Sequence, residues 1–387
     1  MDFILSIVVF IVLDRKGFVF IKVVFNKRCS VHLHRPRHYT LFTKDKIFKC
    51  IKNDSLLMKV AEWFDKNRFK ASSFSDIKKL VQLKRKQKIT ISIVIPTYNE
   101  EKTIEKIIKV LKEKLLDKYK LVDEIVVVDS GSADKTREIA KNAGATVHLA
   151  SEILKRRGRF EGKGENLWKA LYVTKGDIIC WIDGDIQNIH PRFVYGIVGP
   201  LLTNKKLMYI KPFYKRPLKV GNKLQPLSGG RVTELLIRPL FNMYFPRLTG
   251  FIQPLSGEGA ARREILERIP YFTGYGVETG MLIDIIKKFG LTDIAQVDLF
   301  KRVHRNQSLA QLSNMAFAIL QVFVKRANRL GKLILVQEIR NRYRIIQRHN
   351  GEYKMYSKMI EDKQRPPIIT VQEYRKKFKR EPRWVYA

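Results

Sequence analysis

Strand-like runs and amphipathic stretches alternate at a regular pace from residue 91 to residue 188. A β-branched run at 91–95 predicts a strand, and isoleucine and leucine then recur at helical spacing across residues 100–116. Further strands are expected at 124–128, 146–149 and 177–182, and further helices at 134–142 and 165–174. This alternation is typical of an α/β fold with an open, mainly parallel sheet of the Rossmann-like kind.

Outside residues 91–188 the hydrophobic pattern is less regular, but changes in this pattern and in charge still divide the chain into segments. Helices are expected at 190–204, 232–244, 276–289 and 309–330, and strands at 208–214 and 293–299. The pattern suggests five segments: an N-terminal extension at 1–57, a helical segment at 58–90, a first half of the sheet domain at 91–188, a second half at 189–331, and a basic, helical tail at 332–387.

The N-terminal extension begins with an apolar run at 3–13, interrupted only by Ser6. Eleven residues are too few to span a bilayer, and no signal-peptide cleavage pattern follows. Three interpretations stay open: a start upstream of the native one, an anchor at a membrane interface, or an extra packed element. Met58 opens an amphipathic stretch and would serve as the native start under the first interpretation.

Composition and charge narrow the class of protein. With 45% hydrophobic residues the chain can bury a sizeable core, and its net charge of +38 indicates an anionic partner such as nucleic acid, an acidic membrane surface or a phosphorylated substrate. Nucleic acid is disfavoured because neither zinc-finger spacing nor an RNP-type aromatic motif is present. Three cysteines without metal or disulfide spacing fit a reducing cytoplasm.

Two carboxylates follow the most apolar strand of the first half. Asp183 and Asp185 are separated only by Gly184, directly after residues 177–182. A divalent cation such as Mg²⁺ or Mn²⁺ would offset the cost of placing unpaired carboxylates there, because hard cations prefer oxygen ligands. Two capping aspartates are the alternative. The loops at 96–100, 129–132 and 183–188 should converge, since ligands of parallel sheets bind beyond the carboxyl ends of the strands.

The three loop sequences together carry a resemblance. Residues 93–100 (IVIPTYNE), 126–134 (VVVDSGSAD) and 183–185 (DGD) resemble the nucleotide-sugar half of glycosyltransferases of the GT-A type. That likeness covers residues 91–188 and implies a GT-A fold, with the acceptor bound by residues 189–331.

A closer resemblance extends from about residue 60 to residue 331. Residues 162–168, 227–235, 274–278 and 297–306 are similar to the glucosyl-3-phosphoglycerate synthase family. The resemblance implies a retaining enzyme that moves glucose from UDP-glucose, or another nucleoside diphosphate glucose, to the 2-hydroxyl of 3-phospho-D-glycerate. It also implies an Mg²⁺ or Mn²⁺ cofactor, a homodimer in the cytoplasm, and neither nucleic-acid partners nor membrane insertion.

The resemblance also implies roles for individual residues. Asp185 and His304 would ligate the metal, and Asp185, Glu278 and Arg302 would be catalytic. The nucleotide sugar would be bound by Pro96, Thr97, Tyr98, Asn99, Glu100, Ser130, Lys163, Asp183, Gly184, Tyr275, Gly276, Val277, Glu278, Arg302, Val303, His304, Arg305, Asn306 and Gln307. The acceptor would be bound by Gly230, Arg231, Val232, Thr233 and Asn306.

The acceptor site has support from the residues themselves. Gly229 and Gly230 precede an expected helix, so backbone N–H groups and the helix N-terminus would attract an anion, and Arg231 adds a bidentate donor. A plain turn with a solvated Arg231 is the alternative. Spacing gives no support to His304 as a metal ligand, because it lies far from Asp185 in the sequence.

Two other functions compete. An inverting GT-A transferase acting on a polyprenyl phosphate or a polysaccharide would share the first-half motifs, although such enzymes usually carry membrane-spanning helices. A nucleic-acid or anionic-membrane binding module would use the basic surface and would keep its salt-sensitive binding after Asp185 is replaced. Whether the retaining transfer uses a covalent intermediate or attack on the same face is left open by the sequence.

Overall fold

The protein is described by a computed structural model that covers residues 8–13, 19–24, 55–216, 218–220, 223–225, 230–303 and 307–380. The chain divides into two compact units, residues 1–54 and residues 55–387. In the first unit, strand β1 (Val8–Leu13) pairs antiparallel with strand β2 (Val19–Val24). Everything below concerns the second unit.

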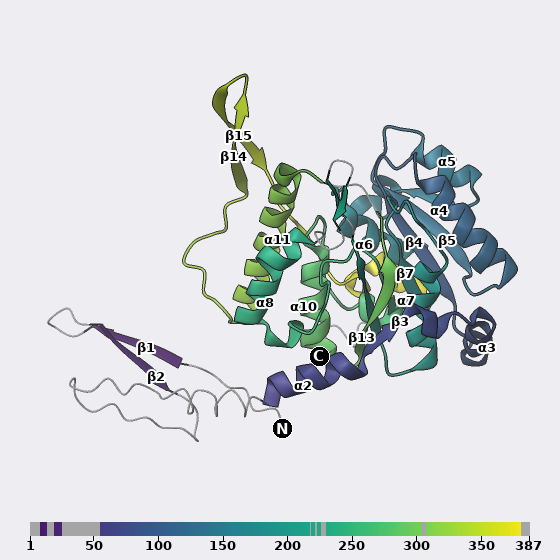
Figure 1. Cartoon of the computed structure of the whole chain (residues 1–387), viewed down its shortest axis with the longest axis horizontal. Helices are drawn as coiled ribbons and strands as arrows, with labels where there is room; N and C mark the ends of the chain where they lie inside the picture. The colour runs from purple at the N-terminus through teal and green to yellow at the C-terminus, as the bar shows by residue number, and fades with distance from the viewer. Residues whose placement is uncertain are drawn as a thin grey trace. The chain divides into compact units, whose positions relative to one another are not determined.

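An eight-stranded sheet forms the centre of the second unit (Figure 1), in the order β3-β13-β8-β11-β7-β4-β5-β6. Every neighbouring pair is parallel except the two made by β11, which runs antiparallel to β7 and β8. The expectation of a mainly parallel α/β sheet is confirmed. The strands are β3 (Arg68–Lys70), β4 (Ile91–Thr97), β5 (Glu124–Asp129), β6 (Thr146–Leu149), β7 (Ile178–Trp181), β8 (Tyr209–Lys215), β11 (Gly259–Arg262) and β13 (Ile294–Lys301).

Alternate side chains of each strand enter separate cores on the two faces of the sheet. Ile93 and Ile95 belong to one core, and Val94 to the other, as the two-residue period of a strand requires. The first face is covered by α3 (Ile77–Gln87), α4 (Ile104–Leu111), α5 (Thr136–Asn142) and α7 (Arg192–Thr203). The second is covered by α2 (Ser55–Lys66), α6 (Lys163–Val173), α8 (Arg238–Tyr244), α10 (Val277–Phe289), α11 (Leu309–Arg329) and α12 (Gln372–Phe378).

Several expected elements differ in extent. The helix expected at 100–116 begins at Ile104 and continues after Leu111 as a π-helical segment, Lys112–Lys118. The helix expected at 232–244 begins at Arg231 and contains a π-helical segment, Thr233–Ile237, before α8. Elements that were not expected are β3, β11, α9 (Arg263–Leu266) and β12 (Tyr271–Phe272), together with the short strands β9 (Leu218–Val220) and β10 (Lys223–Gln225).

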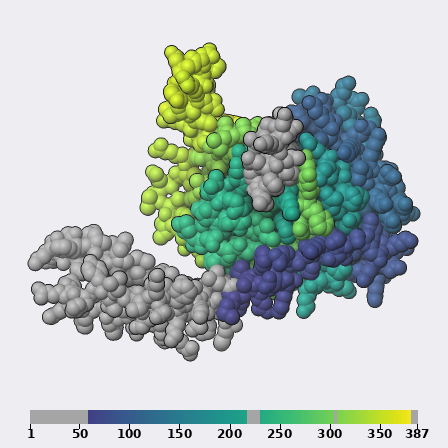
Figure 2. Space-filling view, in the orientation of Figure 1, coloured from purple at the N-terminus to yellow at the C-terminus, as the bar shows by residue number. Residues whose placement is uncertain are grey.

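The expectation of a helical tail after residue 331 is wrong for most of its length. Strands β14 (Arg342–His349) and β15 (Glu352–Met359) form an antiparallel hairpin that stands out from the body of the unit (Figure 2). Asn350 and Gly351 connect them with positive φ angles of 49° and 87°, the conformation that a tight hairpin turn needs. Within the described part of this segment, the helical residues are a 3₁₀ turn, Ile368–Thr370, and α12, both of which follow the two-residue strand β16 (Gln364–Arg365).

Among the described residues, no helix combines the length and the apolar composition needed to cross a membrane.

Candidate active site

A cavity of about 750 Å³ opens beyond the carboxyl ends of β4, β5 and β7. The three loops that were expected to converge meet there, since Pro96, Ser130 and Asp183 all line it. Predicted site residues that line the cavity are Pro96, Thr97, Tyr98, Glu100, Ser130, Lys163, Asp183, Gly184, Asp185, Gly230, Arg231, Val232, Thr233, Tyr275, Glu278, Arg302 and Gln307.

Asp129 locks the first two loops together below the cavity. One carboxylate oxygen accepts hydrogen bonds from the Thr97 hydroxyl at 2.8 Å and the Ser132 hydroxyl at 2.6 Å. The other accepts from the backbone N–H groups of Gly131 at 2.9 Å and Ser132 at 2.8 Å. Because Asp129 is fully buried and satisfied, it has a structural role and leaves Ser130 to face the cavity.

Asn99 joins the same two loops and is not among the residues lining the cavity. Its side-chain oxygen accepts from the Ala133 N–H at 2.9 Å, and its own N–H donates to the Ser132 hydroxyl at 2.8 Å. Asn99 has a φ of 57°, the left-handed conformation that asparagine tolerates better than most residues. It therefore shapes the loop that carries Tyr98 and Glu100.

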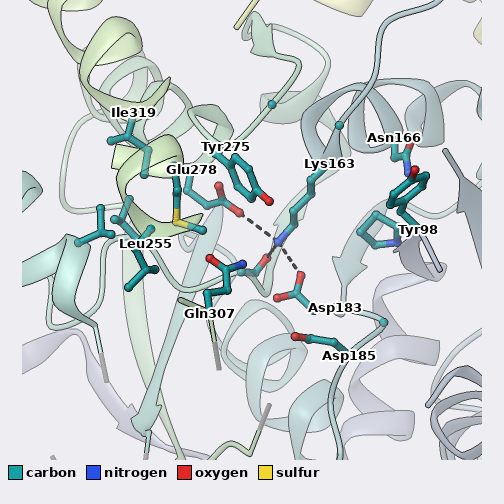
Figure 3. A pocket seen from close by; sticks show the side chains of 18 of the residues that line it. Tyr98, Lys163, Asn166, Asp183, Asp185, Leu255, Tyr275, Glu278, Gln307 and Ile319 are labelled. Atoms are coloured by element: carbon teal, nitrogen blue, oxygen red, sulfur yellow. Dashed lines mark hydrogen bonds and ion pairs between the residues drawn. The ribbon is translucent and has the colours of Figure 1, made fainter. Parts of the chain in front are cut away.

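Lys163 lies at the centre of the site, at the first turn of α6 (Figure 3). Its ammonium group is 2.6 Å from Asp183 Oδ1, 3.0 Å from Glu278 Oε1 and 2.5 Å from the Gly257 carbonyl oxygen. Burial opposes its charge, but Asp183 and Glu278 outweigh burial and hold the pKa of Lys163 above its usual range. Gly257 leaves the space for this contact, since a Cβ there would lie 2.0 Å from Asp183 Oδ2.

Arg302 holds Asp183 and Asp185 in place through hydrogen bonds to both carboxylates. One guanidinium nitrogen donates to Asp183 Oδ2 and to Asp185 Oδ1, each at 2.8 Å, and Nε lies 2.8 Å from a carboxylate oxygen of Glu258. Burial opposes the charge of Arg302, and Glu258 leads the groups that raise its pKa well above the ordinary value. Burial likewise opposes the charge of Asp183, but Lys163 and Arg302 lower its pKa.

Asp185 and its surroundings fit a divalent cation. The Asp185 side chain is 31% exposed and accepts one hydrogen bond from Arg302 through Oδ1, so its carboxylate keeps coordination capacity toward the cavity. Burial, together with the negative charges of Asp185 and Asp183, raises the pKa of neighbouring Glu100 to about 7. This edge of the cavity therefore carries a negative potential that a cation would relieve.

The protein alone does not supply a complete metal cage in the residues that the structure covers. Among them, no three His, Cys, Asp or Glu side chains are grouped to hold a metal ion. The second predicted ligand, His304, lies outside the described residues together with Arg305 and Asn306. A site with one or two protein carboxylates is what Mg²⁺ and Mn²⁺ use when diphosphate oxygens complete the shell.

Three more predicted site residues do not line the cavity. The Gly276 N–H donates to Asp362, and Val277 is buried at the start of α10. The Val303 N–H donates to the Asn188 side chain at 2.7 Å. These residues can act on the site only through the loops to which they belong.

The predicted acceptor residues Gly230, Arg231, Val232 and Thr233 line the same cavity as the two aspartates. Arg231 donates to the Gln307 carbonyl oxygen at 3.1 Å, and Gly230 has a φ of 95°. Gly229 lies outside the described residues. The helix expected after the glycines begins at Arg231, directly after Gly230, and turns π-helical at Thr233, so the expected helix start lies in the wall of the cavity that Gly230 and Arg231 line.

Several polar residues in or below the site were missed by the sequence reasoning. Glu258 is fully buried and accepts from the Tyr214 hydroxyl at 2.6 Å, in addition to pairing with Arg302. Asn166 lines the cavity, and its buried side-chain oxygen has no partner in the structure. The one local signal for Glu258 in the sequence is its position between two glycines, Gly257 and Gly259.

Comparisons with known proteins agree with this geometry. The family model "Glycosyl transferase family 2" matches residues 92–269. A glucosyl-3-phosphoglycerate synthase from Petrotoga mobilis is 52% identical over 316 residues, which cover 82% of this chain and 97% of the relative.

Solved structures of similar proteins extend the comparison to bound ligands. The mannosyl-3-phosphoglycerate synthase from Rubrobacter xylanophilus matches with a TM-score of 0.75 and 37% identity, covering 80% of this chain and 99% of that one. The Mycobacterium tuberculosis glucosyl-3-phosphoglycerate synthase, in complex with Mn²⁺, UDP and phosphoglyceric acid, matches with a TM-score of 0.67 and 38% identity, covering 76% and 95%. The same mycobacterial enzyme has also been solved with Mg²⁺ and UDP.

The mainly parallel sheet, the paired aspartates at the end of β7 and the cavity above them define a glycosyltransferase of the GT-A type. Within that class, the chain belongs to the glucosyl-3-phosphoglycerate synthase family.

Proposed function

We propose that the chain transfers glucose from UDP-glucose to the 2-hydroxyl of 3-phospho-D-glycerate and so makes glucosyl-3-phosphoglycerate, with retention of the anomeric configuration. The observation that carries the proposal is the arrangement of one cavity with Asp183, Asp185 and Lys163 at its centre and Arg231 in its wall. The mycobacterial relative binds UDP, Mn²⁺ and phosphoglyceric acid together, and the Petrotoga relative shares more than half of its residues with this chain over the aligned region.

The lining of the cavity and the family resemblance together support a role for each residue. Tyr98 and Ser130, on the loops after β4 and β5, face the uridine. Asp185 would hold the cation, and the family resemblance adds His304 as a second ligand. Arg231, with Gly230 and Thr233, receives the carboxylate and phosphate of the acceptor, because a guanidinium pairs with either anion through two donors.

The chain's own residues prepare the site before substrate arrives. Arg302 holds Asp183 and Asp185 side by side, and Lys163 ties Asp183 to Glu278. These contacts fix the carboxylates in place, so little reorganisation is needed during the reaction. A divalent cation, when bound, neutralises the negative charge that develops on the departing diphosphate.

Glu278 is assigned a positioning role. Its carboxylate is 3.0 Å from the Lys163 ammonium, and a paired carboxylate is a weaker nucleophile than a free one. Same-face attack by the acceptor, with the diphosphate helping to remove its proton, is therefore favoured over a covalent intermediate. A Glu278→Gln variant that folds and binds donor but has lost all activity would reverse this assignment.

Mannose is the second candidate for the transferred sugar. The Rubrobacter protein, whose fold matches with the higher TM-score of the two, is a mannosyl-3-phosphoglycerate synthase. Donor choice therefore has to be measured.

The test is a product assay. The purified protein is incubated with 3-phosphoglycerate, Mg²⁺ or Mn²⁺, and in turn UDP-glucose, ADP-glucose, GDP-glucose and GDP-mannose. Mass spectrometry identifies the product, and NMR gives its anomeric configuration. An α-linked glucosyl-3-phosphoglycerate from UDP-glucose is expected, and product formation from a polyprenyl phosphate instead would support the inverting alternative.

Three further points stay predictions. A cytoplasmic location and a homodimer are both implied by the resemblance, and the product would serve the synthesis of glucosylglycerate-type compatible solutes. Fractionation of cells and light scattering of the purified protein would test the first two.

A further inference from the structure

The loop that carries Tyr275 and leads to Glu278 encloses a buried carboxylate from the C-terminal segment. Asp362 accepts hydrogen bonds from two backbone N–H groups of this loop, that of Gly274 through Oδ1 and that of Gly276 through Oδ2, the second at 2.7 Å. Asp362 is 2% exposed, although it belongs to the segment expected from the sequence to be a basic tail. The chain thus places a carboxylate directly behind the wall of the cavity.

The two glycines are needed for this contact. A Cβ at Gly274 would lie 2.6 Å from Asp362 Oδ1, and a Cβ at Gly276 would lie 2.2 Å from Val322 Cγ2 and 2.9 Å from Asp362 Oδ2. Real Cβ atoms do not approach other atoms that closely. The Gly-Tyr-Gly sequence therefore lets the backbone wrap the carboxylate while the Tyr275 side chain lines the cavity.

The strand that follows Asp362 is held firmly on both sides. Strand β16 pairs with β12, with Arg365 opposite Tyr271. The Arg365 guanidinium forms hydrogen bonds of 2.6 Å and 2.7 Å with the two carboxylate oxygens of buried Glu165, and it lies 4.2 Å from the centre of the Phe160 ring. This anchor fixes the register of the segment and with it the position of Asp362.

The charge of Asp362 is costly where it lies. Burial raises the pKa of Asp362, the two backbone hydrogen bonds act against that rise, and Glu278 adds to it. A buried carboxylate is retained only when its hydrogen bonds are worth more than its desolvation, and here both bonds go to one short loop.

We propose that Asp362 is a positioning residue for the donor sugar: by holding the Gly274 and Gly276 N–H groups, it sets the placement of Tyr275 and Glu278 in the cavity. This inference rests on the proposed function, because it takes the surface formed by these two residues to be the part of the site that meets the sugar of the donor.

The first test replaces Asp362 by asparagine. Asn has the same size but presents one acceptor and one N–H₂ group, so only one of the two loop N–H groups can be satisfied. A misplacement of about 1 Å caused by a mutation away from the reacting groups can cost about 100-fold in rate. We expect kcat/KM for UDP-glucose to fall by that amount, with the KM for 3-phosphoglycerate unchanged.

A binding measurement separates this role from general destabilisation. Calorimetry with Mn²⁺ should show that D362N binds UDP-glucose more weakly than the wild type but binds UDP equally well, since UDP lacks the sugar. Glu361→Gln is the matched control, because Glu361 is the exposed neighbouring carboxylate, and it should leave both affinities unchanged. Equal loss of UDP and UDP-glucose affinity in D362N would overturn the proposal.

A second variant disturbs the same contact from the other side. Gly274→Ala places a methyl group against Asp362 Oδ1 and should reproduce the D362N defect, and the double variant should be no worse than either single one, because both remove one interaction. Additive defects would contradict the proposal, and G274A keeps it testable if D362N does not fold. Should the wild type bind UDP-glucose but make no product from 3-phosphoglycerate, the proposed acceptor is wrong while the role of Asp362 can still be measured.

Discussion

Glu258 and Arg302 form an ion pair of 2.8 Å beneath the active site, with the carboxylate fully buried and the guanidinium 4% exposed. This pair positions Asp183 and Asp185, because the same guanidinium donates hydrogen bonds to both aspartates. The sequence motif that contains Arg302 indicates neither that Glu258 is the partner of Arg302 nor that the pair is buried.

Glu258→Gln should damage both stability and activity. The amide N–H₂ group would face the cationic Arg302, and removing one partner of a buried ion pair costs about 3–5 kcal/mol. We expect a lower free energy of unfolding in urea titrations and a reduced kcat. Glu264→Gln, which changes an exposed glutamate beyond the far end of β11 from Glu258, should change neither quantity measurably.

Lys163→Met should abolish most of the transfer activity. Asp183 and Glu278 would lose the ammonium group that lies between them, and the donor would lose a preorganised cation. Loss of one such electrostatic group costs on the order of 10²–10³ in kcat. Steady-state kinetics with UDP-glucose checks this, and Lys155→Met, which changes an exposed lysine, provides the control. Activity within threefold of the wild type would rule out a central role for Lys163.

Removal of the divalent cation should eliminate UDP binding. Treatment with EDTA is expected to abolish activity, and Mn²⁺ or Mg²⁺ should restore it, since a cation must offset the charge of Asp185 and the diphosphate together. Asp185→Asn should weaken Mn²⁺-dependent UDP binding in calorimetry, whereas Asp65→Asn at an exposed site should not. Metal-independent binding of UDP by the wild type would contradict the assignment of Asp185.

Arg231→Gln should weaken the binding of the acceptor, 3-phosphoglycerate, and leave the binding of the donor unchanged. Loss of a charge-assisted hydrogen bond costs about 1.5–3 kcal/mol, which is about 10- to 100-fold in affinity. We therefore expect a higher KM for 3-phosphoglycerate and an unchanged KM for UDP-glucose. Arg247→Gln, at an exposed position, is the control. An increase in the KM for UDP-glucose of the same size would place Arg231 on the donor side instead.

Lys211 should make the free energy of unfolding depend on pH in the alkaline range. Burial lowers the pKa of Lys211 to about 8 from a usual 10.5, while its ammonium group donates to the Ser256 carbonyl oxygen at 2.6 Å. Between these pH values the unfolded chain binds the proton and the folded chain does not, so the free energy of unfolding should rise as the pH increases. The charged groups that act on it are Glu278, Lys163, Glu258 and Asp183.

Chemical denaturation at pH 8 and pH 10 measures this slope. Lys211→Met should remove the contribution of Lys211 to it, whereas Lys206→Met, which changes an exposed lysine, should leave the slope as in the wild type. An identical slope in K211M and the wild type would show that another group is responsible.

The sequence by itself determined the sheet domain and the loops of its first half. Hydrophobic residues recur with the period of the strand or helix that carries them, because the backbone geometry sets which side chains share a face. The strands at 91–95 and 124–128 and the helix at 309–330 could therefore be located without tertiary information. Parallel topology then brings Pro96, Ser130 and Asp183 to one edge, because the carboxyl ends of parallel strands lie together.

The hairpin of the tail was missed although its signal was present. Asn350-Gly351 is a favoured two-residue turn, but the many lysines and arginines among the flanking residues obscure the hydrophobic alternation that would mark two strands. The short strand β11 had little signal of its own, since Gly-Ala-Ala-Arg becomes a strand only between two neighbours that supply its hydrogen bonds.

Only the tertiary structure decided which charges meet. Glu258 and Arg302, or Asp362 and Gly276, are separated by tens of residues, and no local period relates them. Electrostatic and hydrogen-bonded contacts depend on distances of about 3 Å that arise when distant segments pack. The sequence therefore identifies which residues have the chemistry for the site, and the packing of the chain selects their partners.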